Sequence, residues 1–158
     1  FLQLVMAREI YTGDKMGKLF IVLLLGINLV FASDFWEKGW HQGNSMYHLS
    51  NKNKDRLEIA CDYQSSGITL MDSENGLGGL INVIFDNKRK IITPTYISID
   101  DRTSSADSAW ENFLYGLQNS NHFVIEAQNG KKYTFEPVNS KEVLDGIVES
   151  CTEYIGGM

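Results

Sequence analysis

The residues best suited to acid–base, nucleophilic or metal chemistry show no catalytic spacing. The three histidines, His41, His48 and His122, form neither the i, i+4 pair of a zinc-protease helix nor a compact cluster with cysteine. The sequence also lacks the Gly-x-Ser-x-Gly nucleophile elbow and the Ser-x-x-Lys motif of penicillin-binding enzymes. We therefore predict no catalytic residue, no metal site and no cofactor.

Neighbouring carboxylates are the remaining candidates for catalysis. They occur at Asp100–Asp101 and within Asp72–Glu74. A glycosidase needs two carboxylates that face each other across a cleft, and adjacency in sequence does not establish that arrangement. We expect a protein that is not an enzyme, and a small wall-glycan hydrolase is kept as an alternative.

Acidic and aromatic side chains suit a different task, the binding of a protein partner. Asp100, Asp101 and Asp107 cluster before the first predicted helix, and Trp36 and Trp40 fall in a glycine-containing stretch outside the predicted strands. Tryptophan is enriched at interface hot spots, and acidic clusters complement basic active-site clefts. These five residues are the predicted partner-binding candidates. In the alternative interpretation, the tryptophans cover an open end of the sheet and the aspartates cap the helix or stay solvated.

The segment before these residues is typical of a secretory signal peptide. Met16–Lys18 supplies a start and a positive charge, and Leu19–Ala32 is an uncharged run of 14 residues that ends in a small residue. A transmembrane helix needs about 20 apolar residues, so this run is short for an anchor. We expect cleavage after Ala32 and a periplasmic or secreted product without stable membrane insertion. An uncleaved N-terminal anchor is the alternative.

The domain organisation follows from this segment. Residues 1–15 are expected to be an upstream extension, residues 16–32 the signal peptide and residues 33–158 one mature domain. The whole chain has a net charge of −6, which becomes −7 without residues 1–32 because that segment holds three basic and two acidic residues. Such a surface repels a phosphate backbone, so nucleic acid is not an expected partner.

The chain has two cysteines, Cys61 and Cys151. In an exported protein a single pair of cysteines is expected to oxidise. We therefore predict a Cys61–Cys151 disulfide that joins an early strand to the last helix.

Hydrophobic periodicity predicts an α+β fold. Apolar and polar residues alternate in 57–63, 123–127 and 133–135, and the other predicted strands are β-type apolar runs. An amphipathic helix is predicted from Ser104 to Gln118, and Asn129–Gly130 predicts a type I′ hairpin turn. A final helix carries Cys151 on its apolar face. The expected architecture is an antiparallel sheet, with a sandwich as one way to fold it, two packed helices and one disulfide. The predicted strands are 45–49, 57–63, 68–71, 80–85, 91–99, 123–127 and 133–135.

One pattern resembles a known group of proteins. It consists of Trp40, the sequence Tyr-His-Leu-Ser-Asn at Tyr47–Asn51, the strand Leu57–Cys61 and the helix that delivers Cys151. It resembles small exported Gram-negative proteins of the invasion-associated locus B type and periplasmic immunity proteins of type VI secretion systems. The resemblance implies an inhibitor that inserts a loop or edge into the cleft of a cell-envelope hydrolase toxin, and a homodimer. An accessory or structural envelope component associated with a secretion apparatus is the alternative.

Overall fold

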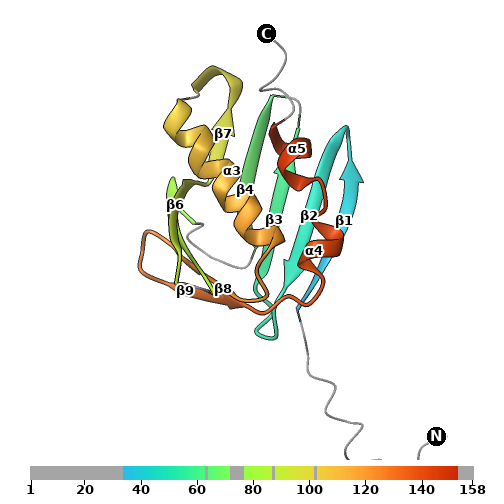
Figure 1. Ribbon diagram of the computed structural model, residues 1–158, viewed down its shortest axis with the longest axis vertical. Helices are drawn as coiled ribbons and strands as arrows, with labels where there is room; N and C mark the ends of the chain where they lie inside the picture. Colours follow the sequence, from blue (N-terminus) through green and yellow to red (C-terminus); the bar gives the residue numbers. More distant parts are fainter. Residues whose placement is uncertain (1–33, 63, 72–76, 87, 102, 153–158) are drawn as a thin grey trace, which may run out of the picture. The chain divides into compact units, whose positions relative to one another are not determined.

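The computed structural model describes residues 34–62, 64–71, 77–86, 88–101 and 103–152 (Figure 1). The expected extension at 1–15 and the expected signal peptide at 16–32 lie outside these residues. Among the described helices, none is long and apolar enough to span a membrane.

The first sheet has five antiparallel strands in the order β1-β2-β3-β4-β7. Its central strand β3 alternates as predicted, with Leu57, Ile59 and Cys61 buried and the residues between them partly exposed. Side chains on a strand alternate between the two faces, so one face of this sheet supplies the core. The strands are β1 (Phe35–His41), β2 (Asn44–Ser50), β3 (Arg56–Cys61), β4 (Ser65–Met71) and β7 (Tyr96–Ser98).

The second sheet has four antiparallel strands in the order β6-β5-β8-β9: β6 (Lys90–Pro94), β5 (Leu80–Phe85), β8 (Phe123–Glu126) and β9 (Lys132–Phe135). The strand predicted at 91–99 is therefore two strands in different sheets. The chain changes sheet at Thr95, whose N–H donates to Gly79 and whose carbonyl accepts from Ile68. Pro94 precedes this switch on an edge strand, where its missing N–H costs no ladder bond.

The β8–β9 hairpin is confirmed, but its turn differs from the predicted type. Type I′ requires a positive φ at both central residues. Here only Gly130 has one, at 80°, and Asn129 does not. Gly130 N–H donates to Ala127 C=O, and Ala127 N–H donates to Lys131 C=O. The connection is thus a three-residue loop in which a type I turn is followed by a bulged glycine.

The helices are α3 (Ser104–Gln118), α4 (Ser140–Val143) and α5 (Ile147–Thr152), with a short 3₁₀ turn η1 (Ile99–Asp101) before α3. Thr103 caps α3, accepting a bond from Ala106 N–H. The single final helix predicted from the sequence is two short helices. Gly146 interrupts it with a φ of 71°, a left-handed conformation that glycine adopts without strain.

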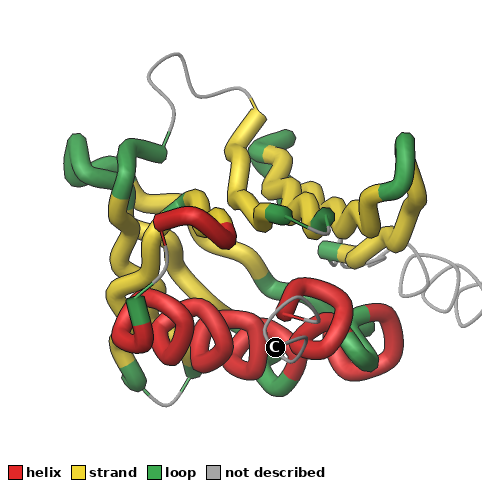
Figure 2. Tube along the Cα trace, turned by 90° about the horizontal axis from the view of Figure 1, so that it is seen from above, coloured by secondary structure: helices red, strands yellow, loops and turns green. Residues whose placement is uncertain are grey.

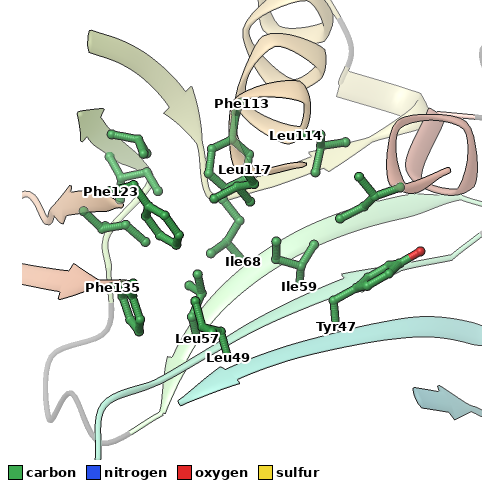
Figure 3. Packing of buried hydrophobic residues seen from close by; sticks show 14 of the residues in the cluster. Tyr47, Leu49, Leu57, Ile59, Ile68, Phe113, Leu114, Leu117, Phe123 and Phe135 are labelled. Atoms are coloured by element: carbon green, nitrogen blue, oxygen red, sulfur yellow. The ribbon is translucent and has the colours of Figure 1, made fainter. Parts of the chain in front are cut away.

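The helices α3, α4 and α5 form one layer, and the opposite face of the five-stranded sheet carries no described helix (Figure 2). Side chains of α3, of the five-stranded sheet and of the four-stranded sheet converge on a shared core (Figure 3). Close packing of α3 depends on Gly116, since a Cβ there would lie 2.5 Å from the Phe85 ring. The predicted α+β class, with antiparallel sheets and packed helices, is confirmed.

The predicted disulfide is also present. Cys61 on β3 and Cys151 on α5 are bonded, with 4.9 Å between their Cα atoms and both side chains buried. The Ser66 hydroxyl next to this bond donates to Cys151 C=O. The disulfide therefore holds the last helix on the middle of the five-stranded sheet.

Candidate protein-binding surfaces

Trp36 corrects a sequence-based expectation. It was expected outside the regular strands, but it lies in β1 opposite Leu49, on the core face of the sheet, and is 2% exposed. Its backbone N–H donates to Asn139 Oδ1 at 2.8 Å, and the Asn139 amide donates to Trp36 C=O at 2.9 Å. Asn139 is the N-cap residue of α4, but its side chain makes no cap hydrogen bond and binds the β1 backbone. Trp36 is thus a core residue, and the prediction that it lies outside the strands is wrong.

Trp40 also lies in β1 rather than outside the strands, but it is 71% exposed. It shares a face of the strand with Trp36 and Lys38 because alternate residues point to the same side. The Lys38 ammonium lies 5.4 Å from the centre of the Tyr47 ring on the neighbouring strand. The end of β1 therefore presents a cation and a large aromatic side chain to solvent.

Asp100 belongs to a second exposed surface, at the opposite edge of the same sheet. We call Tyr96, Ile99 and Asp100 the η1 surface. Tyr96 is 60% exposed and Ile99 43% exposed, and Asp100 is exposed as well. Three side chains of different chemistry, aromatic, aliphatic and acidic, thus face solvent within five residues of sequence.

The other two predicted aspartates, Asp101 and Asp107, are not counted in the η1 surface. Asp101 lies in η1, but its side chain is outside the described part of the structure. Asp107 was expected before the first helix, but it lies inside the first turn of α3, is half-buried and takes part in an interaction. An acidic residue in the first turn is favourable next to the positive end of the helix dipole, which accounts for Asp107.

The structure does not bring Trp40 and Asp100 into one site. Trp40 aligns across the sheet with Ser45, Cys61, Ser66 and Ile97, so β2, β3 and β4 separate it from β7. Four strand spacings correspond to about 19 Å. The predicted candidates therefore form two separate surfaces at the two edges of one sheet.

An apolar face on the four-stranded sheet was missed by the sequence reasoning. Leu80 is 51% and Ile92 57% exposed on its outer side, and Glu126 aligns with Ile92 across the sheet through Asn82. A hollow of about 320 Å³ is lined by these three residues together with Ala127 and Gln128 and their neighbours. The available signal was the pair Ile91–Ile92, because two consecutive apolar residues in a strand cannot both point inward.

Two aspartates have perturbed acidities for different reasons. Burial raises the pKa of Asp34, although the Glu136 backbone N–H, which donates to its Oδ2 at 2.6 Å, acts in the opposite direction. Burial also acts to raise the pKa of Asp62, but hydrogen bonds from the Gln64 and Ser65 backbone and from the Ser65 hydroxyl outweigh it and lower the pKa. Both carboxylates hold the chain in place, Asp34 beside β1 and Asp62 in the β3–β4 turn.

Two of the described histidines lie beside carboxylates. His48 Nδ1 lies 3.1 Å from Glu58 Oε2, and His122 Nδ1 lies 3.7 Å from Asp86 Oδ1. In the part of the chain that the structure describes, no three His, Cys, Asp or Glu side chains gather so as to hold a metal ion. The hollow beside Ile92 includes one carboxylate, Glu126, among its described lining residues.

Comparison with known proteins identifies relatives without an assigned activity. A family model described as YfjT matches residues 34–144. The chain is 27% identical over 138 residues to "Uncharacterized protein YkfB" of Escherichia coli strain K12, with 78% of this chain and 86% of that protein covered. No solved structure is significantly similar.

Proposed function

The chain belongs to the YfjT family, and we propose that it is an exported, non-enzymatic binding protein that inhibits a cell-envelope hydrolase in the periplasm, as an immunity protein neutralises a toxin. The observation that carries this proposal is the η1 surface. It exposes the aromatic Tyr96 on β7, and the aliphatic Ile99 and the acidic Asp100 on η1, which follows β7 directly.

Hydrogen bonds hold Ile99, within the η1 surface, and Thr103, at the start of α3. The Ile99 N–H donates to Gln64 C=O at 2.9 Å, which ties η1 to the β3–β4 turn. On the other side Thr103 caps α3, and Asp107 N–H donates to its carbonyl. A segment fixed in this way loses little conformational entropy on binding, which is an advantage for an inhibitory loop.

Its chemistry fits the active-site cleft of an enzyme that degrades an anionic envelope polymer. Such a cleft is basic, and an exposed carboxylate at Asp100 complements it. Tyr96 and Ile99 add exposed apolar area on the residues that precede that charge in the sequence. The acidic net charge of the chain favours the same class of basic partner by long-range attraction.

The proposed compartment is supported by the Cys61–Cys151 bond. Disulfides persist in oxidising compartments such as the bacterial periplasm and are rare in the cytosol. The apolar run at Leu19–Ala32, which ends in a small residue, also supports export.

The experiment begins with affinity capture by the oxidised protein from envelope extracts of bacteria that deliver antibacterial toxins. Each captured hydrolase is then assayed on purified peptidoglycan while the protein is titrated in. We expect inhibition that is complete at a one-to-one ratio. The double variant Tyr96→Ala/Asp100→Lys should inhibit at least about tenfold more weakly, a change that corresponds to about 1.4 kcal/mol.

The matched control is Tyr115→Ala, which removes an aromatic side chain that is 56% exposed in the last turn of α3, at the helix end that does not follow η1. It should inhibit as well as the unmodified protein. The proposal is wrong if captured hydrolases stay fully active at saturating protein, or if the protein alone releases soluble fragments from peptidoglycan. The second result would favour the hydrolase alternative.

A second candidate function, an accessory component of an envelope assembly, is favoured by the outer face of the four-stranded sheet. Exposed apolar patches of this kind mark interaction sites on soluble domains. Exchange of Leu80 and Ile92 for serine should then release the protein from envelope complexes of unstressed cells. Co-purification of those complexes with the double variant would contradict this role.

A further inference from the structure

The open edge of β1 is partly closed by the protein itself. The loop Gln42–Gly43 has φ values of 50° and 93°, which is a type I′ turn, and it joins the paired residues His41 and Asn44. The backbone groups of His41 and Gly39 therefore point toward β2. Those of Trp36, Lys38 and Trp40 point away from the sheet, because neighbouring residues alternate in an antiparallel ladder.

The chain that follows β9 closes the first part of this edge. Val138 N–H donates to Asp34 C=O at 3.2 Å, and Asn139 holds both outward groups of Trp36. Residues 137–139 thus run parallel to the start of β1 before they enter α4. No described residue hydrogen-bonds the outward N–H or C=O of Lys38 or Trp40. In Figure 1 this end of β1 forms the margin of the sheet.

We propose that a second copy of this chain pairs with the open end of β1, antiparallel and centred on Gly39, to form a two-fold symmetric dimer with one continuous sheet. Lys38 and Trp40 of one copy then exchange backbone hydrogen bonds with Trp40 and Lys38 of the other. The pairing stops at Trp36, whose outward groups Asn139 already occupies.

The side chains of this segment are complementary to themselves in that register. Lys38 faces Trp40 of the second copy on the core side of the sheet, where an ammonium beside an indole is attractive. Glu37 faces His41 of the second copy on the outer side, which pairs a carboxylate with an imidazole. Gly39 faces its own counterpart on the axis and presents no side chain that would keep the strands apart. All four flanking residues are exposed in the single chain.

The dimer is independent of the proposed inhibitory role. The η1 surface lies at the other edge of the sheet, about 19 Å from β1. Pairing through β1 therefore leaves both η1 surfaces accessible, and either proposal can fail alone.

The first test measures the molar mass of the oxidised protein, expressed from the full sequence, by sedimentation equilibrium. The salt concentration is about 0.15 M, at which charges on the two copies are screened beyond about 8 Å. We expect the mass of a dimer at protein concentrations up to about 0.1 mM. A series that reaches this concentration reveals any dimer whose dissociation constant is below about 0.1 mM. Trp40→Pro removes an outward N–H and fills the edge without touching the β1–β2 ladder, and it should give a monomer with an unchanged circular dichroism spectrum. A monomeric unmodified protein, or a dimeric Trp40→Pro variant, overturns the proposal.

The second test changes the side chains of Glu37 and His41, which face each other across the proposed interface. His41→Glu places two carboxylates opposite each other and should raise the dissociation constant about tenfold. The double variant Glu37→Lys/His41→Glu restores an opposite-charge pair and should restore the dimer. Ser108→Glu, at an exposed position on α3, is the matched control that adds a negative charge without effect. A failure of the double variant to rescue contradicts the register.

The third test checks that the two-fold axis of the dimer passes at Gly39. Residues opposite each other in a non-hydrogen-bonded antiparallel pair have Cα atoms about 4.5 Å apart, within disulfide range. A Cβ at Gly39 is tolerated by the single chain, where its closest contact is Met46 Cβ at 4.0 Å. Gly39→Cys should therefore oxidise to a covalent dimer, and Ser108→Cys should not. Equal cross-linking of both variants would refute pairing at Gly39.

Discussion

Reduction of the Cys61–Cys151 bond is the perturbation with the most definite expected magnitude. The two cysteines are 90 residues apart in sequence. In the chain-entropy model, a bond that closes such a loop lowers the entropy of the unfolded chain enough to stabilise the fold by about 4.6 kcal/mol at 25 °C. Domains of this size have total stabilities of about 5–15 kcal/mol, so the bond supplies a large share.

The assay is urea unfolding of the oxidised and the reduced protein, followed by circular dichroism. With a slope of about 2 kcal/mol per molar urea, the midpoint should fall by about 2.3 M on reduction. The slope itself should rise because the reduced unfolded chain is less compact. Cys61→Ala/Cys151→Ala is the control, and its midpoint should not respond to the reductant. A loss below about 1 kcal/mol would show that the unfolded chain is not constrained as the entropy model assumes.

Three further predictions test residues described above. Trp36→Ala should cost about 3–5 kcal/mol of unfolding free energy, as for other buried large aromatics, whereas Tyr115→Ala on the surface should change it by less than about 0.5 kcal/mol; equal losses in urea titrations would contradict the assigned burial. Gly116→Ala should destabilise the protein despite the better helix propensity of alanine, because its Cβ would overlap the Phe85 ring at 2.5 Å, and a raised melting temperature would refute this. The two perturbed aspartates should act in opposite directions with pH. Asp34 has a raised pKa, so stability should fall as pH rises from 3.8 through that pKa, and Asp34→Asn should remove this fall. Asp62 has a lowered pKa, so its contribution should be present above pH 3.8 and lost as pH falls below it; Asp62→Asn should therefore differ from the unmodified protein at neutral pH and converge with it in acid, and a constant difference would refute the assignment.

Sequence periodicity predicted the elements that depend on local pattern. The strand with Leu57, Ile59 and Cys61 and the helix Ser104–Gln118 have the predicted type and nearly the predicted bounds. Their apolar residues repeat every second or every third to fourth position, which a single segment reveals. The disulfide was also predictable, because two cysteines allow one pairing within the chain.

The errors concern contacts between distant segments. The run at 91–99 reads as one strand, because nothing local shows that Thr95 bonds Gly79 on one side and Ile68 on the other. Trp36 was predicted to lie outside the strands. Asn139, which bonds its backbone N–H and C=O in β1, lies 103 residues later in the chain. Exposure of Trp40 and Asp100 could be anticipated from composition. Their separation across the sheet followed only from strand order.

The contact between Trp36 and Asn139 has a consequence for the order in which the fold can be completed. β1 is synthesised first, yet the segment that closes its edge is made 103 residues later. Until then the strand offers unpaired backbone groups along its whole length, a form that is prone to pair with other chains. Contacts this distant in sequence also slow folding, because a long loop must close before they form. A chain that is truncated before residue 137 should therefore be trapped with an open first strand and aggregate.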